Sequence, residues 1–166
     1  MRDDSDARFR ELVHNLLAFS ARLEAIRGRF GAHLGLTGIQ YTILISVRHL
    51  EGEEGVGVKA LAEHLGLSGA FVTIETGKLI KEDMLMKRPN PLDRRRVLLS
   101  VSHKGRTCLH KLAPVQREIN DLIFEALDEE RFDALCTEAA ALRHNGERAI
   151  ALADYLLSDT KGNADV

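Results

Sequence analysis

The chain has 166 residues, of which 45% are hydrophobic and 29% charged, the balance of an ordinary globular protein. No apolar run approaches the roughly 18 residues of a membrane-spanning helix, and the polar N-terminus lacks the apolar core of a signal peptide. We therefore expect a cytoplasmic protein with no membrane partner. With a formal net charge of −2, the chain as a whole does not have the basic character of many DNA-binding proteins.

Charge is nevertheless segregated along the chain. Residues 78–106 carry nine basic and three acidic side chains, a net charge of +6, whereas residues 118–138 carry one basic and eight acidic ones, a net charge of −7. A chain polarised in this way can orient on a polyanion. Two solvated helix faces of opposite charge would give the same pattern.

Apolar residues recur at steps of three and four over residues 7–30, which predicts an amphipathic helix. Gly31 and Gly35 interrupt the pattern and are expected to end that helix. Thr37 and Gln40 have the spacing of a capping box and predict the start of a second helix.

A helix-turn-helix is predicted next. Gly55–Val58 has the character of a very short strand, and Lys59–Leu65 that of a short helix. Gly66 can adopt the left-handed conformation that ends such a helix, and Ser68 can cap a following helix that reaches Glu82. Two helices separated by a three-residue turn with Gly have helix-turn-helix spacing.

A β-hairpin is predicted after this unit. Met84–Arg88 and Arg96–Val101 are β-prone, and the two prolines of Pro89–Asp93 keep that segment out of a strand interior. A helix followed by a hairpin with an Arg-rich tip is typical of a winged helix. Its helix enters a DNA major groove, while its wing reaches phosphates or the adjacent minor groove.

Two long helices are predicted at the C-terminal end. Ser102 can cap the first, in which Pro114 should produce a kink. Asp128 can cap the second, whose apolar stripe is interrupted at Asn145–Gly146. A domain of about 60 residues cannot bury so long a stripe, so we expect a homodimer built from both termini.

The expected fold is mainly α with a small β-hairpin wing. A winged helix-turn-helix DNA-binding domain would occupy residues 37–101, flanked by helical dimerisation regions over residues 1–36 and 102–166.

Nothing indicates an enzyme, a cofactor or a metal site. There is no Gly-rich phosphate loop and no GxSxG motif, and the seven histidines form no HxxxH or HExxH pair. Cys108 and Cys136 cannot make a CxxC motif and are expected to be buried free thiols. A thiol-responsive or metal-responsive regulator stays an alternative.

Five segments carry a family resemblance over about residues 8–157: Leu36–Tyr41, Leu61–Ser68, Val72–Thr73, Asp93–Val97 and Leu99–Gly105. In order and spacing they resemble the multiple-antibiotic-resistance-regulator (MarR) family. The resemblance implies a homodimeric regulator, most often a repressor, that binds a pseudo-palindromic DNA operator. It also implies release by a small, frequently aromatic, effector.

The resemblance matches Arg95 to the wing arginine that enters the minor groove and Asp93 to the acid that braces it. The recognition helix has no Lys or Arg between Ser68 and Gly77, so bidentate reading of guanine is not available on its first two turns. Hydroxyl groups, or apolar contact with thymine methyls, would have to read the bases. The candidate DNA-binding residues are Ser68, Gly69, Ala70, Phe71, Thr73, Thr76, Lys78, Lys87, Arg88, Asp93, Arg94, Arg95 and Lys104.

The resemblance places an effector pocket between the dimerisation helices and the winged domain. The candidate residues are Phe19, Arg22, Phe30, His33, Tyr41 and Ile45. Arg22 and His33 would bind a carboxylate, although ordinary surface and loop roles suit them too. A winged-helix protein-docking module without sequence-specific DNA binding is the alternative function.

Overall fold

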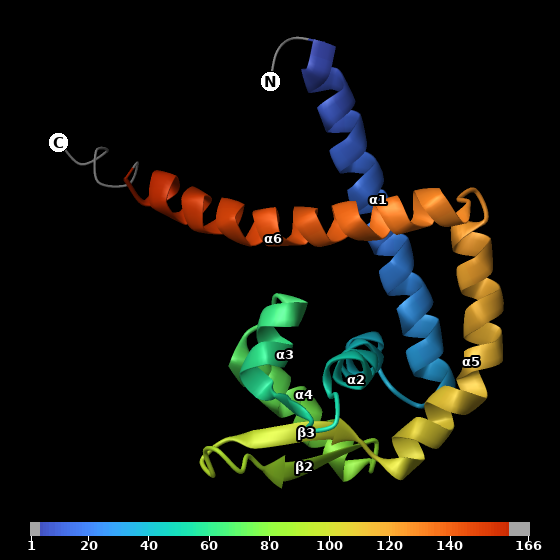
Figure 1. Cartoon of the computed structure of the whole chain (residues 1–166), viewed down its shortest axis with the longest axis vertical. Coiled ribbons are helices and arrows are strands. Elements are labelled where there is room, and N and C mark those ends of the chain that lie inside the picture. Colours follow the sequence, from blue (N-terminus) through green and yellow to red (C-terminus); the bar gives the residue numbers. More distant parts are fainter. Residues whose placement is uncertain (1–3, 160–166) are drawn as a thin grey trace. The chain divides into compact units, whose positions relative to one another are not determined.

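The computed structural model describes residues 4–159 and divides into two compact units, the first ending at Gln116 and the second beginning at Arg117 (Figure 1). Over the described residues the elements are α1 (Asp4–His33), α2 (Gly38–Leu50), β1 (Val56–Gly57), α3 (Val58–Leu65), α4 (Gly69–Lys81), β2 (Leu85–Pro89), β3 (Val97–Val101), α5 (His103–Phe124) and α6 (Glu129–Asp159). The mainly α fold with a small wing is confirmed.

The connection between α1 and α2 is tighter than expected. α1 continues to His33, so the prediction that Gly31 ends it was wrong. Gly31 is buried, and an added Cβ would lie 2.7 Å from the carbonyl oxygen of Thr37. This glycine therefore permits a close approach of two backbone segments. The turn is made at Gly35, whose φ is +73°.

Local capping signals set the ends of the helices that carry the helix-turn-helix. The amide of Gln40 donates to Thr37 Oγ1 at 3.3 Å, and the amide of Thr37 donates to Gln40 Oε1 at 3.1 Å, which confirms the capping box. Gly66 ends α3 in the left-handed conformation, with φ 64° and ψ 31°. Ser68 Oγ caps α4 by accepting from the amide of Phe71 at 3.2 Å.

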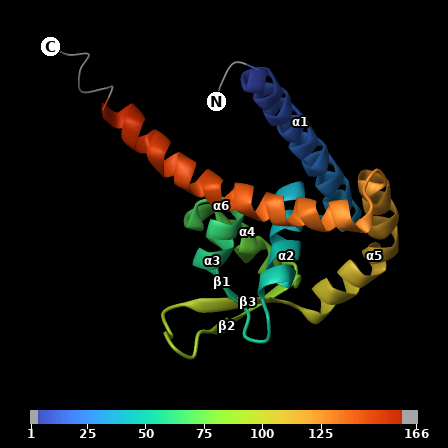
Figure 2. The same cartoon turned by 45° about the horizontal axis from the view of Figure 1, so that its top comes forward.

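The sheet is antiparallel in the order β1-β3-β2. Val56 of β1 pairs with Leu99 of β3, which confirms the third strand. Pro89, expected in the loop, is the last residue of β2 instead. It is tolerated there because β2 is an edge strand. Figure 2 shows β2 and β3 side by side with their connecting loop extending away from the helices.

The core of the first unit lies between α2, α3, α4 and the sheet. It is built from branched and long aliphatic side chains, each at most 1% exposed: Ile43, Leu44, Val47, Leu61, Val72, Leu79, Leu85, Leu99 and Val101. Burial of each such side chain contributes about 1.5–3 kcal/mol to folding, so this core holds the recognition helix and the wing in one body.

The C-terminal helices begin at the predicted caps. Ser102 Oγ accepts from the amide of Gly105 at 2.9 Å, and Asp128 Oδ1 accepts from the amide of Arg131 at 2.9 Å. α6 runs through Asn145 and Gly146 without a break, so the interruption of its apolar stripe there does not interrupt the helix. One glycine costs a helix only about 1 kcal/mol, which the neighbouring helix-forming residues offset.

Both terminal helices expose apolar side chains. On α1 these are Phe9, Leu12, Leu16, Leu17 and Phe19, and on α6 they include Phe132, Leu135, Leu142, Ile150, Leu156 and Leu157. Within residues 4–159 no single helix has the length and hydropathy of a membrane span; α1 and α2 pass that test only as a pair bent by 90°.

Candidate nucleic-acid interface

The recognition helix α4 buries one face and exposes the other. Val72 and Leu79 are fully buried, whereas Phe71 is 39% and Ile74 59% exposed. The other exposed residues of the helix are Gly69, Ala70, Thr73, Lys78 and Lys81. The N-terminal half of the exposed face is thus mainly apolar, and the C-terminal half is cationic.

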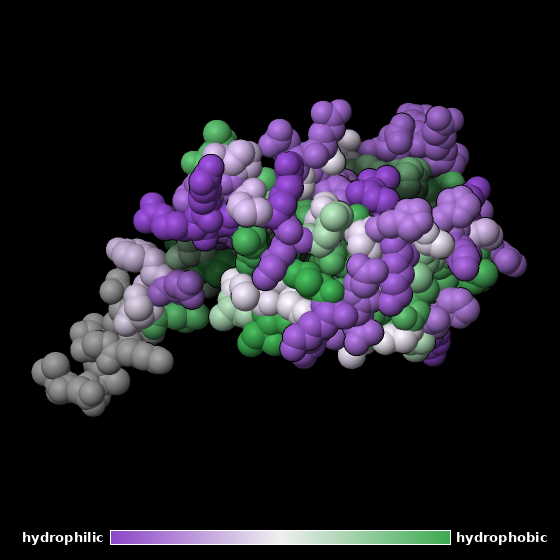
Figure 3. Space-filling model, turned by 90° about the horizontal axis from the view of Figure 1, so that it is seen from below, coloured by the Kyte–Doolittle hydropathy of each residue, from purple (hydrophilic) through white to green (hydrophobic). Residues whose placement is uncertain are grey.

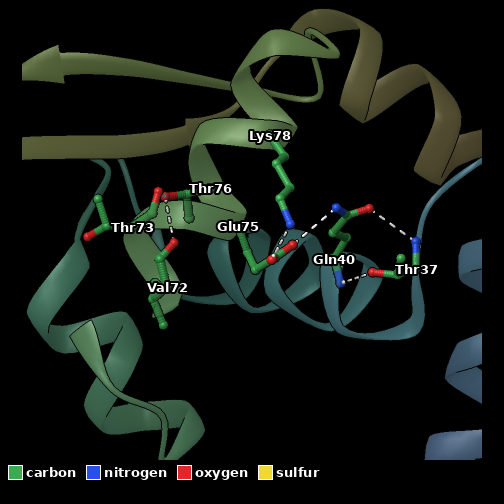
Figure 4. Close-up of polar contacts among 7 residues, drawn as sticks. All are labelled: Thr37, Gln40, Val72, Thr73, Glu75, Thr76 and Lys78. Atoms are coloured by element: carbon green, nitrogen blue, oxygen red, sulfur yellow. Dashed lines mark hydrogen bonds and ion pairs between the residues drawn. The ribbon is translucent and has the colours of Figure 1, made fainter. Parts of the chain in front are cut away.

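Thr76 was expected on the exposed face, and that prediction was wrong. It is only 3% exposed, because it lies one helical turn from both Val72 and Leu79 and shares their inward face. Its hydroxyl donates within the helix, 2.8 Å from the Val72 carbonyl oxygen (Figure 4). Thr76 therefore packs beneath the candidate interface and does not form part of it.

Glu75 is a buried carboxylate that sequence reasoning missed. It is 6% exposed and accepts from Gln40 Nε2 at 3.1 Å and from Lys78 Nζ at 2.6 Å (Figure 4). The Lys78 hydrogen bond lowers the pKa of Glu75, the Gln40 hydrogen bond and the Lys78 charge add to this, and burial opposes it. Gln40 serves two partners, since its other amide atom completes the α2 capping box. The negative charge of α4 is thus held inward.

At the wing tip, the carboxylate of Asp93 forms ion pairs with two arginines, Arg95 and Arg96. Asp93 Oδ1 accepts from the amide of Arg95 at 3.1 Å and lies 3.5 Å from Arg95 Nε, while Asp93 Oδ2 lies 3.2 Å from Arg96 Nε. The Arg95 side chain remains 94% exposed. The pairing of Asp93 with Arg95 was expected, whereas that with Arg96 was missed.

The remaining cationic candidates line the wing and its root. Lys87, Arg88 and Arg94 are exposed. Arg88 Nη2 donates to the Glu54 carbonyl oxygen at 2.7 Å, and Lys104 Nζ donates to the Glu82 carbonyl oxygen at 2.6 Å. In Figure 3 hydrophilic side chains cover much of the face seen from below, with hydrophobic ones between them.

A buried ion-pair cluster fixes the root of the wing. Glu51 is 2% exposed, and its carboxylate accepts from the amide of Val101 at 2.8 Å and from Nη2 of Arg106 at 3.0 Å. Nη1 of Arg106 and Nη1 of Arg48 each lie 3.0 Å from the other carboxylate oxygen. The cluster joins the end of α2 to the end of β3 and the first turns of α5. Arg48 is a local partner, but no local sequence pattern could show the contacts with Val101 and Arg106, which are 50 and 55 residues from Glu51.

The six candidate effector residues differ in their exposure. Phe30 and Tyr41 are buried against each other with ring centroids 5.6 Å apart, while Ile45 is half-buried. Phe19, Arg22 and His33 are exposed on α1. Burial raises the pKa of Tyr41, which Arg27 opposes, and its hydroxyl has no hydrogen-bond partner among the described residues.

A cavity of about 610 Å³ lies beside these residues in the first unit. It is lined by none of the six, but by Glu24, Arg27, Gly38, Ile39, Thr42, Ser46, His64, Leu65 and Leu67. Sequence reasoning missed this cavity because its lining comes from three helices that are separate in the chain.

The two cysteines differ in environment. Cys108, expected to be buried, is half-buried against the core. Cys136 is exposed on α6, so the prediction that it is buried was wrong. In the part of the chain that the structure describes, no group of three His, Cys, Asp or Glu side chains is placed to hold a metal ion.

No protein-family model and no curated protein matches this sequence. Solved structures do match. A MarR protein from Peptoclostridium difficile has a TM-score of 0.69 at 18% identity, covering 83% of this chain and 88% of its own. MepR from S. aureus in complex with DNA has a TM-score of 0.65 at 14% identity, with 80% and 96% covered. A mutant MarR from E. coli complexed with operator DNA has a TM-score of 0.62 at 17% identity, with 78% and 92% covered.

At these identities the likeness is one of fold. It extends over most of both chains. The chain has the winged-helix fold of MarR-family transcriptional regulators.

Proposed function

We propose that the protein is a cytoplasmic, homodimeric, DNA-binding transcriptional regulator, most simply a repressor. Each protomer would place α4 in a major groove and its wing tip in the adjacent minor groove of a pseudo-palindromic operator. The observation that carries the proposal is Arg95, a 94% exposed guanidinium held by Asp93 at the tip of a stiff, proline-flanked loop. A narrow minor groove concentrates negative potential and favours such a group.

The charge distribution of the interface supports this proposal. Lys87, Arg88 and Arg94 are exposed on the wing, and the one acid in the middle of α4, Glu75, is buried and paired. A polyanion approaching α4 therefore meets apolar groups and cations. Three of the structures with this fold are complexes with DNA or an oligodeoxyribonucleotide.

We further propose that a small aromatic acid releases the protein from its operator. The 610 Å³ cavity has the size of a small-ligand site, and Arg27 and His64 in its lining are potential donors to a carboxylate. The six effector candidates named from the sequence stay a prediction, and Tyr41 is the one among them whose buried hydroxyl lacks a partner.

A second candidate function follows from the apolar half of α4. Exposed Phe71 and Ile74 also suit a protein partner, and a winged helix can dock proteins without reading DNA. The two functions differ in salt dependence and in sequence preference.

The test is a selection of bound duplexes from genomic fragments, followed by fluorescence anisotropy on the enriched site. We expect two inverted half-sites roughly one helical turn, about 10 base pairs, apart. Affinity should fall steeply as salt rises, because each neutralised phosphate releases counterions. Failure to enrich any motif, together with binding that salt does not weaken, would favour the docking function.

A further inference from the structure

The exposed surface of the first two turns of α4 is hydrocarbon. Ala70 and Ile74 lie one turn apart on the same line of the helix, with Phe71 and Thr73 on either side. Ile74 is 59% exposed and Phe71 39% exposed, whereas Val72 between them in the chain is fully buried. Water-exposed aliphatic and aromatic groups at the centre of an interface are expected to be covered by the bound partner.

The polar atoms beside these groups are already engaged. The hydroxyl of Thr73 donates to the Gly69 carbonyl oxygen at 2.7 Å, so its proton is used inside the helix, and only its oxygen lone pairs and its methyl group remain. Ser68 Oγ accepts from the amide of Phe71 at 3.2 Å, which leaves it one O–H to donate and one lone pair. Neither hydroxyl offers the two coplanar groups that read a purine edge.

Charge on α4 is divided between its two halves. The carboxylate of Glu75 is turned away from the surface and is bound by Gln40 and Lys78 (Figure 4). Lys78 and Lys81 follow in the C-terminal half, where both are exposed. In helix-turn-helix proteins the N-terminal part of the recognition helix contacts base edges. The apolar N-terminal half of α4 is therefore suited to contact base edges, and its cationic C-terminal half is suited to contact phosphates.

The major groove offers one apolar group, the C5-methyl of thymine. We infer that α4 reads its operator through thymine methyls, with Ile74 and Phe71 as the specificity-determining residues. The base pairs beneath them are A·T pairs whose thymine methyl is buried against these two side chains. This inference rests on the proposed function, and it names the class of half-site that the protein selects.

The experiment uses the full chain and its selected operator with thymine replaced by deoxyuridine, which keeps base pairing but lacks the methyl group. Replacement at the half-site positions nearest α4 should weaken binding about fourfold for each methyl removed, the factor that corresponds to burial of one such group. Replacement at an equal number of thymines outside the half-sites should leave affinity unchanged.

Variants of the protein identify the contact. Ile74→Ala should bind the thymine operator more weakly and lose part of the difference between thymine and deoxyuridine, whereas Ile74→Val should keep most of it. Phe71→Ala should lose the remaining part of the difference in affinity between the thymine and deoxyuridine operators. Because Ile74 is largely exposed, melting curves of its variants should match those of the wild type.

Three results would overturn the inference. Equal affinity of the wild type for thymine and deoxyuridine operators would exclude methyl reading while leaving operator binding intact. Full retention of the thymine preference in both Ile74→Ala and Phe71→Ala would exclude these two residues as readers. Absence of sequence-specific binding to any duplex would overturn the proposed function as well.

Discussion

At the scale of single residues, Glu51 is the charged group on which the root of the wing depends. We expect Glu51→Ala to lower the free energy of unfolding by about 2–4 kcal/mol, because the buried amide of Val101 and the guanidinium of Arg106 lose their acceptor together. Urea denaturation would measure the loss. Arg48→Ala is the matched control: its side chain is 57% exposed, so its loss should cost no more than about 1 kcal/mol. Equal losses in the two variants would contradict this account of the cluster.

Arg95 is the residue on which operator binding is expected to depend most. Arg95→Ala should cost about 1–3 kcal/mol of operator affinity in fluorescence anisotropy, the range for a specific arginine contact. The melting temperature should not change, since the side chain is 94% exposed. Arg95→Lys should restore only part of the affinity, because an ammonium lacks the planar, weakly hydrated fork.

The control for this experiment is Leu92→Ala, an uncharged substitution on the same loop at a residue 95% exposed. Asp93→Ala should weaken binding less than Arg95→Ala, although it frees Arg96 as well as Arg95. An Arg95→Ala protein that binds like the wild type would remove the wing from the proposed interface.

At the scale of elements, the pairing of Glu75 with Lys78 and Gln40 joins α4 to α2 and makes their packing depend on pH. The pKa of Glu75 is lowered from 4.5 in the folded state. The pair therefore stabilises the fold fully at a pH above that value, and this stabilisation is lost as pH falls through the lower, folded-state pKa.

We expect Lys78→Met to reduce stability at pH 7 by about 0.5 kcal/mol, the scale of such a helical pair, with helix propensity preserved. The difference from wild type should shrink as pH falls below 4.5 in thermal unfolding. Lys81→Met, at an exposed lysine on the same helix, should show no pH-dependent difference. A Lys78→Met deficit that persisted in full well below that pH would show that the carboxylate is not responsible.

At the scale of the whole molecule, α1 and α6 each expose a row of apolar side chains among the described residues. We propose that a second copy covers them, since closed two-fold dimers are the commonest way in which a protein buries such a surface. Leu142→Asp or Ile150→Asp should then give a monomeric or aggregating protein in sedimentation velocity, because burial of each such side chain contributes about 1.5–3 kcal/mol. Deletion of residues 1–20 should act in the same way.

The matched control for these variants is Arg148→Asp, which places an acid on the same helix at a position that is already charged and exposed. It should remain a dimer. A compact dimer after Leu142→Asp and Ile150→Asp would place the interface on another surface.

The sequence by itself determined the features that are decided within about four residues. Thr37, Ser68, Ser102 and Asp128 cap helices where they were expected to, and Gly66 ends α3 in the left-handed conformation. Each of these features depends only on backbone groups within the same helical turn. The neighbouring residues in the sequence are therefore enough to predict where the helix begins or ends. The order of the elements and the winged-helix fold follow from these signals and the apolar periodicity between them.

Only the tertiary structure decided which polar side chains are buried. Periodicity alone left Thr76 among the surface residues of α4, and it gave no sign that Glu75 turns inward to Gln40, 35 residues away. Glu51 likewise lies in no sequence motif, and its partners come from α5 and β3. A buried charge is stable only when donors surround it, and Gln40, Val101 and Arg106 reach these two carboxylates only in the packed fold.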